Sequence, residues 1–293
     1  MPTSIPVRTE FRFGSNELPS DFAHPPLIEA WLGVEFTDAV DFAKVDAKEW
    51  RRRLGPEWQS TFQSIGPAER HAPGMTQVEN QLRNVMNDRA IRFGTHGFSF
   101  GWLGYDGCIY PRYEAIRDGF VATLDAVRDV LPKIETPQRW AVTYLNRIPQ
   151  GTVWTTPNDW SFFRLWQPNP LHKLGIDLDE FAGCWQFPLE VERSSLRVEM
   201  SHEPCLAAAN RVESLWLRIT ASGPTDTTEP SLFDGLDYGR EMIVRAFNEL
   251  VTADAKSYWG VTPQKIAATG GSMGLQPWPD ETAERWGCWR ELK

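Results

Sequence analysis

The stretch PRYEAIRDGFVATLDAVRDVLP, residues 111–132, predicts the long helix around which the rest of the chain is organised. Proline is favoured in a first helical turn and cannot continue a helix, so Pro111 and Pro132 mark the two ends. Between them, apolar side chains recur at helical spacing and make one continuous stripe, formed by Tyr113, Ile116, Phe120, Leu124, Val127 and Leu131. Such a stripe has to be buried, and the flanking segments have the pattern of a sheet that could bury it.

The segments before this helix alternate apolar and polar residues with the two-residue period of strands. Ile28–Phe36 predicts a half-buried strand, and Asp38 is expected to cap a helix that ends at Leu54. Further strands are predicted over residues 78–83, 90–93 and 97–103. In the last of these, glycine and serine share one face, where another group could pack close to the backbone.

The residues after the helix repeat this order more loosely. Strands are predicted over residues 139–148, 185–191, 196–200 and 215–219. Pro188 places the second of these at a sheet edge or at a bulge. Ser231, followed by Asp234, resembles a capping box and predicts a second long helix that runs to Leu250. Thr252 is expected to cap one more, short helix.

Strands therefore come in runs and outnumber helices, which favours an α+β fold over a doubly wound sheet. We expect a curved, mainly antiparallel sheet with two long amphipathic helices on one face. Each half reads as strands followed by a long helix, so a pseudo-duplicated arrangement is a further expectation, although the halves share no convincing residue-level repeat.

The predicted organisation has four parts. They are an extended N-terminal arm over 1–25, a first β-rich half with the central helix over 26–150, a second β-rich half with the C-terminal helices over 151–260, and a docking tail rich in proline and tryptophan over 261–293. The region 26–260 is expected to form one compact unit.

The formal net charge of −9 argues against a polycationic nucleic-acid binder, because such a protein needs a basic face to attract phosphates. The N-terminal residues lack the apolar stretch of a secretory signal, and no run of about 18 apolar residues predicts a membrane span. The four cysteines are widely scattered, which is typical of free thiols in a reducing compartment. We therefore expect a cytoplasmic protein that binds neither membranes nor nucleic acids.

Two patterns have the residue types of a catalytic site, and each has a simpler interpretation. The run GGSMG around Ser272 matches a nucleophile elbow, but that motif needs a following helix and a later histidine, whereas prolines follow it and the last histidine is His202. The acids of Asp177-x-Asp179-Glu180 could pair for acid–base chemistry, yet adjacent acids more often open a helix or lie in a solvated loop.

Two further patterns concern ions. Cys184, His202 and Cys205 have part of a zinc-ligand spacing, but the paired spacings of a closed site are missing. Arg51–Arg53 could contact phosphate, although cations at a helix end also complement the helix dipole. The sequence therefore predicts no catalytic residue, no metal site and no cofactor, and it favours a non-catalytic protein without excluding an enzyme.

The candidates for binding are polar and aromatic residues on the predicted strands and at the start of the central helix. Glu29, Arg147 and Tyr113 could form a cluster that faces a ligand; the alternative is a hydrogen-bonded Glu–Arg pair that ties the sheet together. Fourteen tryptophans exceed what a core needs, so their rings could line an apolar cavity or bind another protein. The candidate ligand- or partner-binding residues are Glu29, Trp31, Trp102, Tyr113, Trp140, Tyr144 and Arg147.

Four short motifs occur in an order and spacing that resembles a sporadically distributed family of uncharacterised prokaryotic proteins. They are PPLIE at Pro25–Glu29, YPRY at Tyr110–Tyr113, YLNR at Tyr144–Arg147 and YWG at Tyr258–Gly260. The resemblance covers about residues 24–260, and the tail departs from it. It implies no established reaction or ligand, but the family's patchy occurrence is similar to that of mobile or defence-associated genes.

These observations together favour a non-catalytic protein-binding or adaptor protein, an accessory component of a mobile or defence-associated locus. The expected partner is another protein, encoded nearby. The alternative that the sequence leaves open is a small-molecule pocket of helix-grip type between the helices and the sheet, with or without enzymatic activity.

Overall fold

The structure, a computed structural model, describes residues 21–40, 47–59, 78–104, 108–131, 136–156, 159–167, 174, 181–191, 193–203, 213–225 and 229–262. The helices are α1 (Ala47–Leu54), α2 (Tyr113–Val130), α3 (Glu229–Leu250) and α4 (Ala253–Tyr258). The strands are β1 (Asp21–Phe22), β2 (Leu27–Glu35), β3 (Trp58–Gln59), β4 (Val78–Asn84), β5 (Arg89–Gly94), β6 (Gly97–Leu103), β7 (Arg139–Pro149), β8 (Phe181–Pro188), β9 (Ser195–Glu203), β10 (Ser214–Pro224) and β11 (Val261–Thr262).

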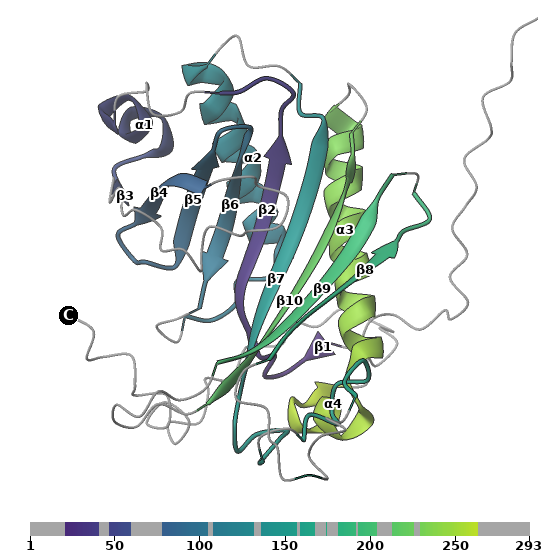
Figure 1. The fold of residues 1–293 in the computed structure, drawn as a ribbon. Coiled ribbons are helices and arrows are strands. Elements are labelled where there is room, and N and C mark those ends of the chain that lie inside the picture. The colour runs from purple at the N-terminus through teal and green to yellow at the C-terminus, as the bar shows by residue number, and fades with distance from the viewer. Residues whose placement is uncertain are drawn as a thin grey trace, which may run out of the picture.

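Most of the described strands join one sheet in the order β3-β4-β5-β6-β2-β7-β10-β9-β8. Every neighbouring pair in this sheet is antiparallel, and β1 pairs with β11 in a separate two-stranded ribbon. The sheet is strongly twisted, and α2 and α3 lie behind it in Figure 1. The predicted α+β class with a mainly antiparallel sheet is therefore confirmed.

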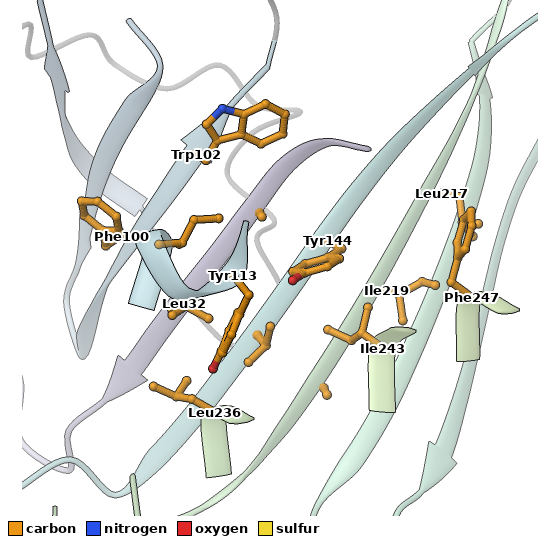
Figure 2. Close-up of a cluster of buried hydrophobic side chains, with 14 of the residues drawn as sticks. Leu32, Phe100, Trp102, Tyr113, Tyr144, Leu217, Ile219, Leu236, Ile243 and Phe247 are labelled. Atoms are coloured by element: carbon orange, nitrogen blue, oxygen red, sulfur yellow. The ribbon is translucent and has the colours of Figure 1, made fainter. Parts of the chain in front are cut away.

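The main core lies between the sheet and the helices, because alternate residues of each strand point to the helix side. Helix α2 packs on β6 and β2, and α3 packs on β10 and β7. Figure 2 shows side chains of these four strands directed to one side, where they meet Leu236, Ile243 and Phe247 of α3.

Glycines let the helices approach the sheet closely. A methyl group on Gly235 or Gly239, which lie one turn apart on α3, would come closer than 3.0 Å to the ring of Trp140 in β7. Gly119 of α2 faces Phe100 of β6 in the same way. On each of these helices, the glycines lack a side chain where the helix faces the sheet, and an aromatic ring of the sheet occupies that space.

Two predicted helix starts are wrong. Asp38 does not cap a helix, because residues 37–40 are not helical and the N–H of Val40 donates to the carbonyl of Thr95 at 2.7 Å. Ser231 is not an N-cap either, since α3 begins at Glu229 and runs through it. In contrast, the predicted cap at Thr252 is confirmed, because its hydroxyl accepts a hydrogen bond from the N–H of Ala255.

Several predictions concern residues outside the described ranges. These are the arm over 1–20, the acidic residues 177–180, Cys205, the GGSMG run at 270–274 and the tail beyond Thr262. Among the helices that the structure describes, none combines the length and the apolar character needed to cross a membrane.

Candidate functional site

The structure distributes the seven predicted binding residues over the two faces of the sheet. The helix-covered face carries Trp102, Tyr113, Trp140 and Tyr144, all within the main core. The opposite face carries Glu29, Trp31 and Arg147. The tryptophan rings are interior groups, since the residues are exposed by only 5% for Trp31, 2% for Trp102 and 2% for Trp140. In this structure they fill space inside the molecule.

Glu29 belongs to a buried polar cluster on the face opposite the helices. Its carboxylate accepts a hydrogen bond from Trp31 Nε1 at 2.6 Å and lies 3.7 Å from a terminal nitrogen of Arg92. The Arg92 guanidinium is 3.8 Å from the centroid of the Trp31 ring, and its Nε donates to Gln81 at 3.0 Å. An arginine therefore does pair with Glu29, and the ion pair joins β2 to β5 across β6.

The intervening strand β6 makes room for this cluster. Gly101 lies opposite Trp31, and a methyl group there would overlap the indole ring. The prediction that the small residues of this strand allow close packing is thus confirmed. All four members of the cluster are buried and linked to one another, an arrangement that holds the sheet together.

Arg147 and Tyr113 do not join this cluster into one site. Arg147 Nε donates to the hydroxyl of Ser214 at 3.0 Å, and its guanidinium lies 5.9 Å from the ring centroid of Trp216 on β10. Tyr113 lies on the other side of the sheet, within the core under the helices. A single ligand therefore cannot touch Glu29 and Tyr113 together.

A second polar cluster lies between α2 and α3 and contains the tyrosines of two quoted motifs. The hydroxyl of Tyr113, at the start of α2, donates to Asp237 of α3 at 2.7 Å, and Arg117 Nε pairs with the same carboxylate oxygen at 3.1 Å. The hydroxyls of Tyr110 and Tyr144 are 3.0 Å apart. Figure 2 shows Tyr113 and Tyr144 on the helix side of the sheet, near Leu236 and Ile243.

Burial controls the ionisation of these phenols. It raises the pKa of Tyr110, Tyr113 and Tyr144 well above the ordinary value of 10, because a phenolate would lose its hydration inside the protein. The hydrogen bond to Asp237 raises the pKa of Tyr113 further. The three hydroxyls therefore remain protonated hydrogen-bond donors in neutral solution.

Arg240 of α3 completes this second cluster. Its guanidinium lies 5.8 Å from the ring centroid of Tyr113, and its charge acts against the raised pKa of Tyr144. The residue is partly buried, and its Nε has no hydrogen-bond acceptor. Sequence analysis singled out Tyr113 and Tyr144 but missed Arg240 and Asp237, because nothing local to α3 shows that these two residues face the start of α2.

The edge strand β8 is a third distinctive feature. It pairs with β9 without any register shift, and its other side has no strand among the described residues. Its sequence, FAGCWQFP, contains no charged residue, and Phe187 is 38% exposed. The opposite edge is β3, which has only two residues. Natural edges are usually protected by short length, charges or bulges. Apart from its terminal proline, β8 has none of these. Of the two alternatives predicted from Pro188, a sheet edge or a bulge, the structure shows the edge.

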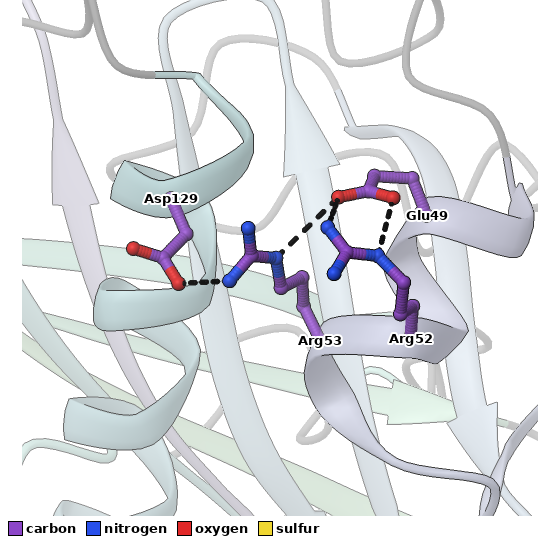
Figure 3. A network of polar contacts seen from close by, with 4 residues as sticks. All are labelled: Glu49, Arg52, Arg53 and Asp129. Carbon is purple, nitrogen blue, oxygen red and sulfur yellow. Dashed lines mark hydrogen bonds and ion pairs between the residues drawn. The ribbon is translucent and has the colours of Figure 1, made fainter.

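The arginine run in α1 has structural partners. Figure 3 shows Arg52 and Arg53 bonded to Glu49, and Arg53 reaching Asp129 of α2 at 2.5 Å. The hydrogen bond from Arg52 lowers the pKa of Glu49 to about 2, since it favours the carboxylate. These contacts join two helices at the surface and account for Arg52 and Arg53 without a phosphate ligand.

The partial zinc spacing does not form a site in the described chain. His202 lies opposite Phe181 in the β8–β9 pair, whereas Cys184 lies opposite Glu199, so the two candidate ligands are on opposite faces of the sheet. His202 Nε2 is 3.3 Å from a carboxylate oxygen of Glu213. The described residues contain no group of three or more histidine, cysteine, aspartate or glutamate side chains that could hold a metal ion.

Comparisons with known proteins add no further constraint. No family model matches the chain, and neither the curated proteins nor the solved structures include a significant match.

Proposed function

We propose that this chain is a non-catalytic protein-binding protein and that β8 accepts an extended segment of another protein as an additional strand. The observation that carries the proposal is the long, uncharged and exposed edge of the sheet at Phe181–Pro188. Strand addition of this kind is a recurring mode of peptide recognition, in which main-chain hydrogen bonds supply affinity and alternate side chains supply specificity.

The backbone of β8 supports this mode of binding. In an antiparallel sheet, half of the N–H and C=O groups of an edge strand point away from its neighbour. Within the described part of the chain, residues 182–188 form hydrogen bonds only in their pairing with β9. A partner strand would satisfy these outward groups in the regular ladder geometry, because β8 contains no bulge that would bend it away.

The side chains of β8 indicate what the partner strand would look like. Trp185 and Phe187 point to the helix side, where Trp185 packs on Phe163 with ring centroids 5.7 Å apart and Phe187 stays 38% exposed. Cys184 and Gln186 point to the other face and are exposed. We therefore expect the partner to be an extended segment that alternates apolar residues, covering the aromatic side, with small polar ones.

Capture from the native host tests this function with the full tagged chain. Two variants place a lysine on the edge, as natural sheets do to block pairing: Phe187→Lys on the apolar side and Cys184→Lys on the polar side. Met86→Lys is the matched control, because Met86 is also an exposed apolar residue, at 72%, but lies in the β4–β5 turn.

We expect a partner that the wild-type chain and Met86→Lys both retain and that both β8 variants lose. Folding of each variant is checked by circular dichroism, and exposed positions are chosen so that the fold is preserved. Capture that is equal in all four proteins, or no specific partner in the native host, would contradict strand addition at β8.

The sheet order also supports a duplicated origin, which we infer from topology. β2, β4, β5, β6 and α2 form a unit whose strands lie in the order β4-β5-β6-β2. β7, β8, β9, β10 and α3 form a unit whose strands lie in the order β8-β9-β10-β7. In both units the last strand returns beside the first, and a long helix follows and covers the same side of the sheet. The two units meet at the β2–β7 pair.

Two further proposals come from the sequence. The resemblance to a sporadically distributed prokaryotic family supports a role as an accessory component of a mobile or defence-associated locus, in which the partner is encoded nearby. The second candidate function is a small-molecule site of helix-grip type. The observation that favours it is Arg240, a partly buried cation between the two helices.

A further inference from the structure

Arg240 has no counter-ion among the residues that the structure describes. No carboxylate of the described residues lies within ion-pair distance of its guanidinium, and its Nε is buried without an acceptor. The nearby acids are engaged elsewhere: Asp237 pairs with Arg117, and Glu241 pairs with Arg245 at 2.6 Å. A partly buried cation loses hydration, and the neutral contacts of Arg240 with Tyr113 and Tyr144 compensate for this less than a carboxylate or phosphate would.

The two tyrosine hydroxyls beside Arg240 include one unused hydrogen-bond donor. The hydroxyls of Tyr110 and Tyr144 are 3.0 Å apart and share one hydrogen bond. That bond uses one of the two hydroxyl protons, so the other can be donated to a further acceptor. Tyr144 is buried, whereas Tyr110 is partly exposed. The free donor is therefore on the side that solvent can reach if Tyr144 donates to Tyr110.

We propose that Arg240, with Tyr110 and Tyr144, binds an oxyanion, the carboxylate or phosphate group of a small ligand, between α2 and α3. A guanidinium presents parallel N–H donors that match the two oxygens of such a group, and it keeps its charge at every physiological pH. The remaining hydroxyl proton of the tyrosine pair adds one neutral donor. Glu114 opposes binding only weakly, because it is exposed at the start of α2 and solvent screens its charge.

The alternative role for Arg240 is a structural contact with the ring of Tyr113. At 5.8 Å from the ring centroid this contact is near the outer limit of a cation–π interaction. It uses the face of the guanidinium, whereas an anion would use N–H groups in its plane; of these, one donates to the Tyr144 hydroxyl and Nε has no acceptor. The two roles therefore differ in whether an added anion binds to the protein.

The test uses the full chain and two simple probes. Sodium phosphate and sodium acetate are titrated in separate experiments at constant ionic strength, by calorimetry and by thermal unfolding. Arg240→Gln removes the charge. Arg240→Lys keeps the charge but removes the planar donor pair, so it remains informative if the glutamine variant fails to fold. Arg245→Gln is the matched control, because it removes a cation from the same helix that already has a carboxylate partner.

We expect at least one anion to bind saturably, with Kd raised roughly tenfold or more in Arg240→Gln, about threefold in Arg240→Lys, and unchanged within about twofold in Arg245→Gln. Acetate alone indicates a carboxylate ligand, and phosphate alone indicates a phosphorylated one. No saturable binding of either anion, or equal binding in the Arg240 variants and the wild-type chain, overturns the inference. Phe187→Lys should bind the anion normally, so this result is independent of strand addition at β8.

Discussion

The replacement Gly235→Ala tests how α3 docks on the sheet, because two physical effects oppose each other at this position. Alanine is more favourable than glycine within a helix by about 1 kcal/mol. The added methyl, however, would lie closer than 3.0 Å to Trp140, whose ring is also confined by Gly223 and Gly239. Overpacking a core costs about 1–3 kcal/mol, and a ring that is 2% exposed cannot swing aside, which favours the upper part of that range. We expect a net loss of about 1–2 kcal/mol in the free energy of unfolding.

The same replacement should have the opposite sign once the ring is removed. Trp140→Leu opens space beside Gly235, so the methyl meets no clash and the helix propensity of alanine dominates. In that background we expect Gly235→Ala to stabilise the protein by about 1 kcal/mol. The coupling between the two positions is then about 2–3 kcal/mol, at the upper end of values for residues in direct contact.

Urea unfolding of the four proteins measures this coupling. Circular dichroism follows the helices, and tryptophan fluorescence follows the core, so agreement of the two transitions supports a two-state treatment. A Gly235→Ala protein that is more stable than the wild type would refute the docking argument. So would additivity of the two replacements within about 0.5 kcal/mol, since the contact would then carry no energy.

Three further predictions concern charged and titratable groups. Arg92→Ala should cost about 3–5 kcal/mol in unfolding free energy, measured by urea unfolding, because it removes the guanidinium that faces the buried carboxylate of Glu29. Arg53→Gln should cost less than about 1 kcal/mol in the same assay, because the side chains of its pair with Asp129 are 33% and 57% exposed. The contribution of Tyr110, Tyr113 and Tyr144 to stability should be constant below about pH 10 and fall above it, because the folded state holds their phenolic protons more tightly than the unfolded state does. Ultraviolet absorbance should show these three tyrosinates forming only as the protein unfolds.

The elements that sequence analysis located well are those whose signals are local. Helix α2 runs from Tyr113 to Val130, within the stretch that Pro111 and Pro132 bound in the sequence, although it begins two residues after Pro111. The prediction that a helix starts at Asp38 is wrong, because the chain there hydrogen-bonds to Thr95 in the β5–β6 turn. No local sequence pattern shows this contact. The predicted N-cap at Ser231 is wrong for a similar reason. Packing on the sheet stabilises α3 from Glu229 onward, so the helix begins before this serine although serine is a good capping residue.

The site residues that sequence analysis missed depend on contacts between distant segments. Glu29 was singled out, but its partner Arg92 lies on a strand that reaches it only across β6. Tyr113 was singled out, but Asp237 and Arg240 come from a helix about 120 residues later in the chain. Period and composition show which face of a strand or helix is apolar; they do not show which two faces meet.

Hydrogen–deuterium exchange of the full chain, with and without the partner captured from its native host, tests strand addition most directly. The account predicts that outward-facing backbone amides within Phe181–Phe187 become protected when the partner binds, because these N–H groups of β8 then join a ladder. Unchanged exchange in β8, with protection rising only on the helices or in the β4–β5 turn, would contradict it.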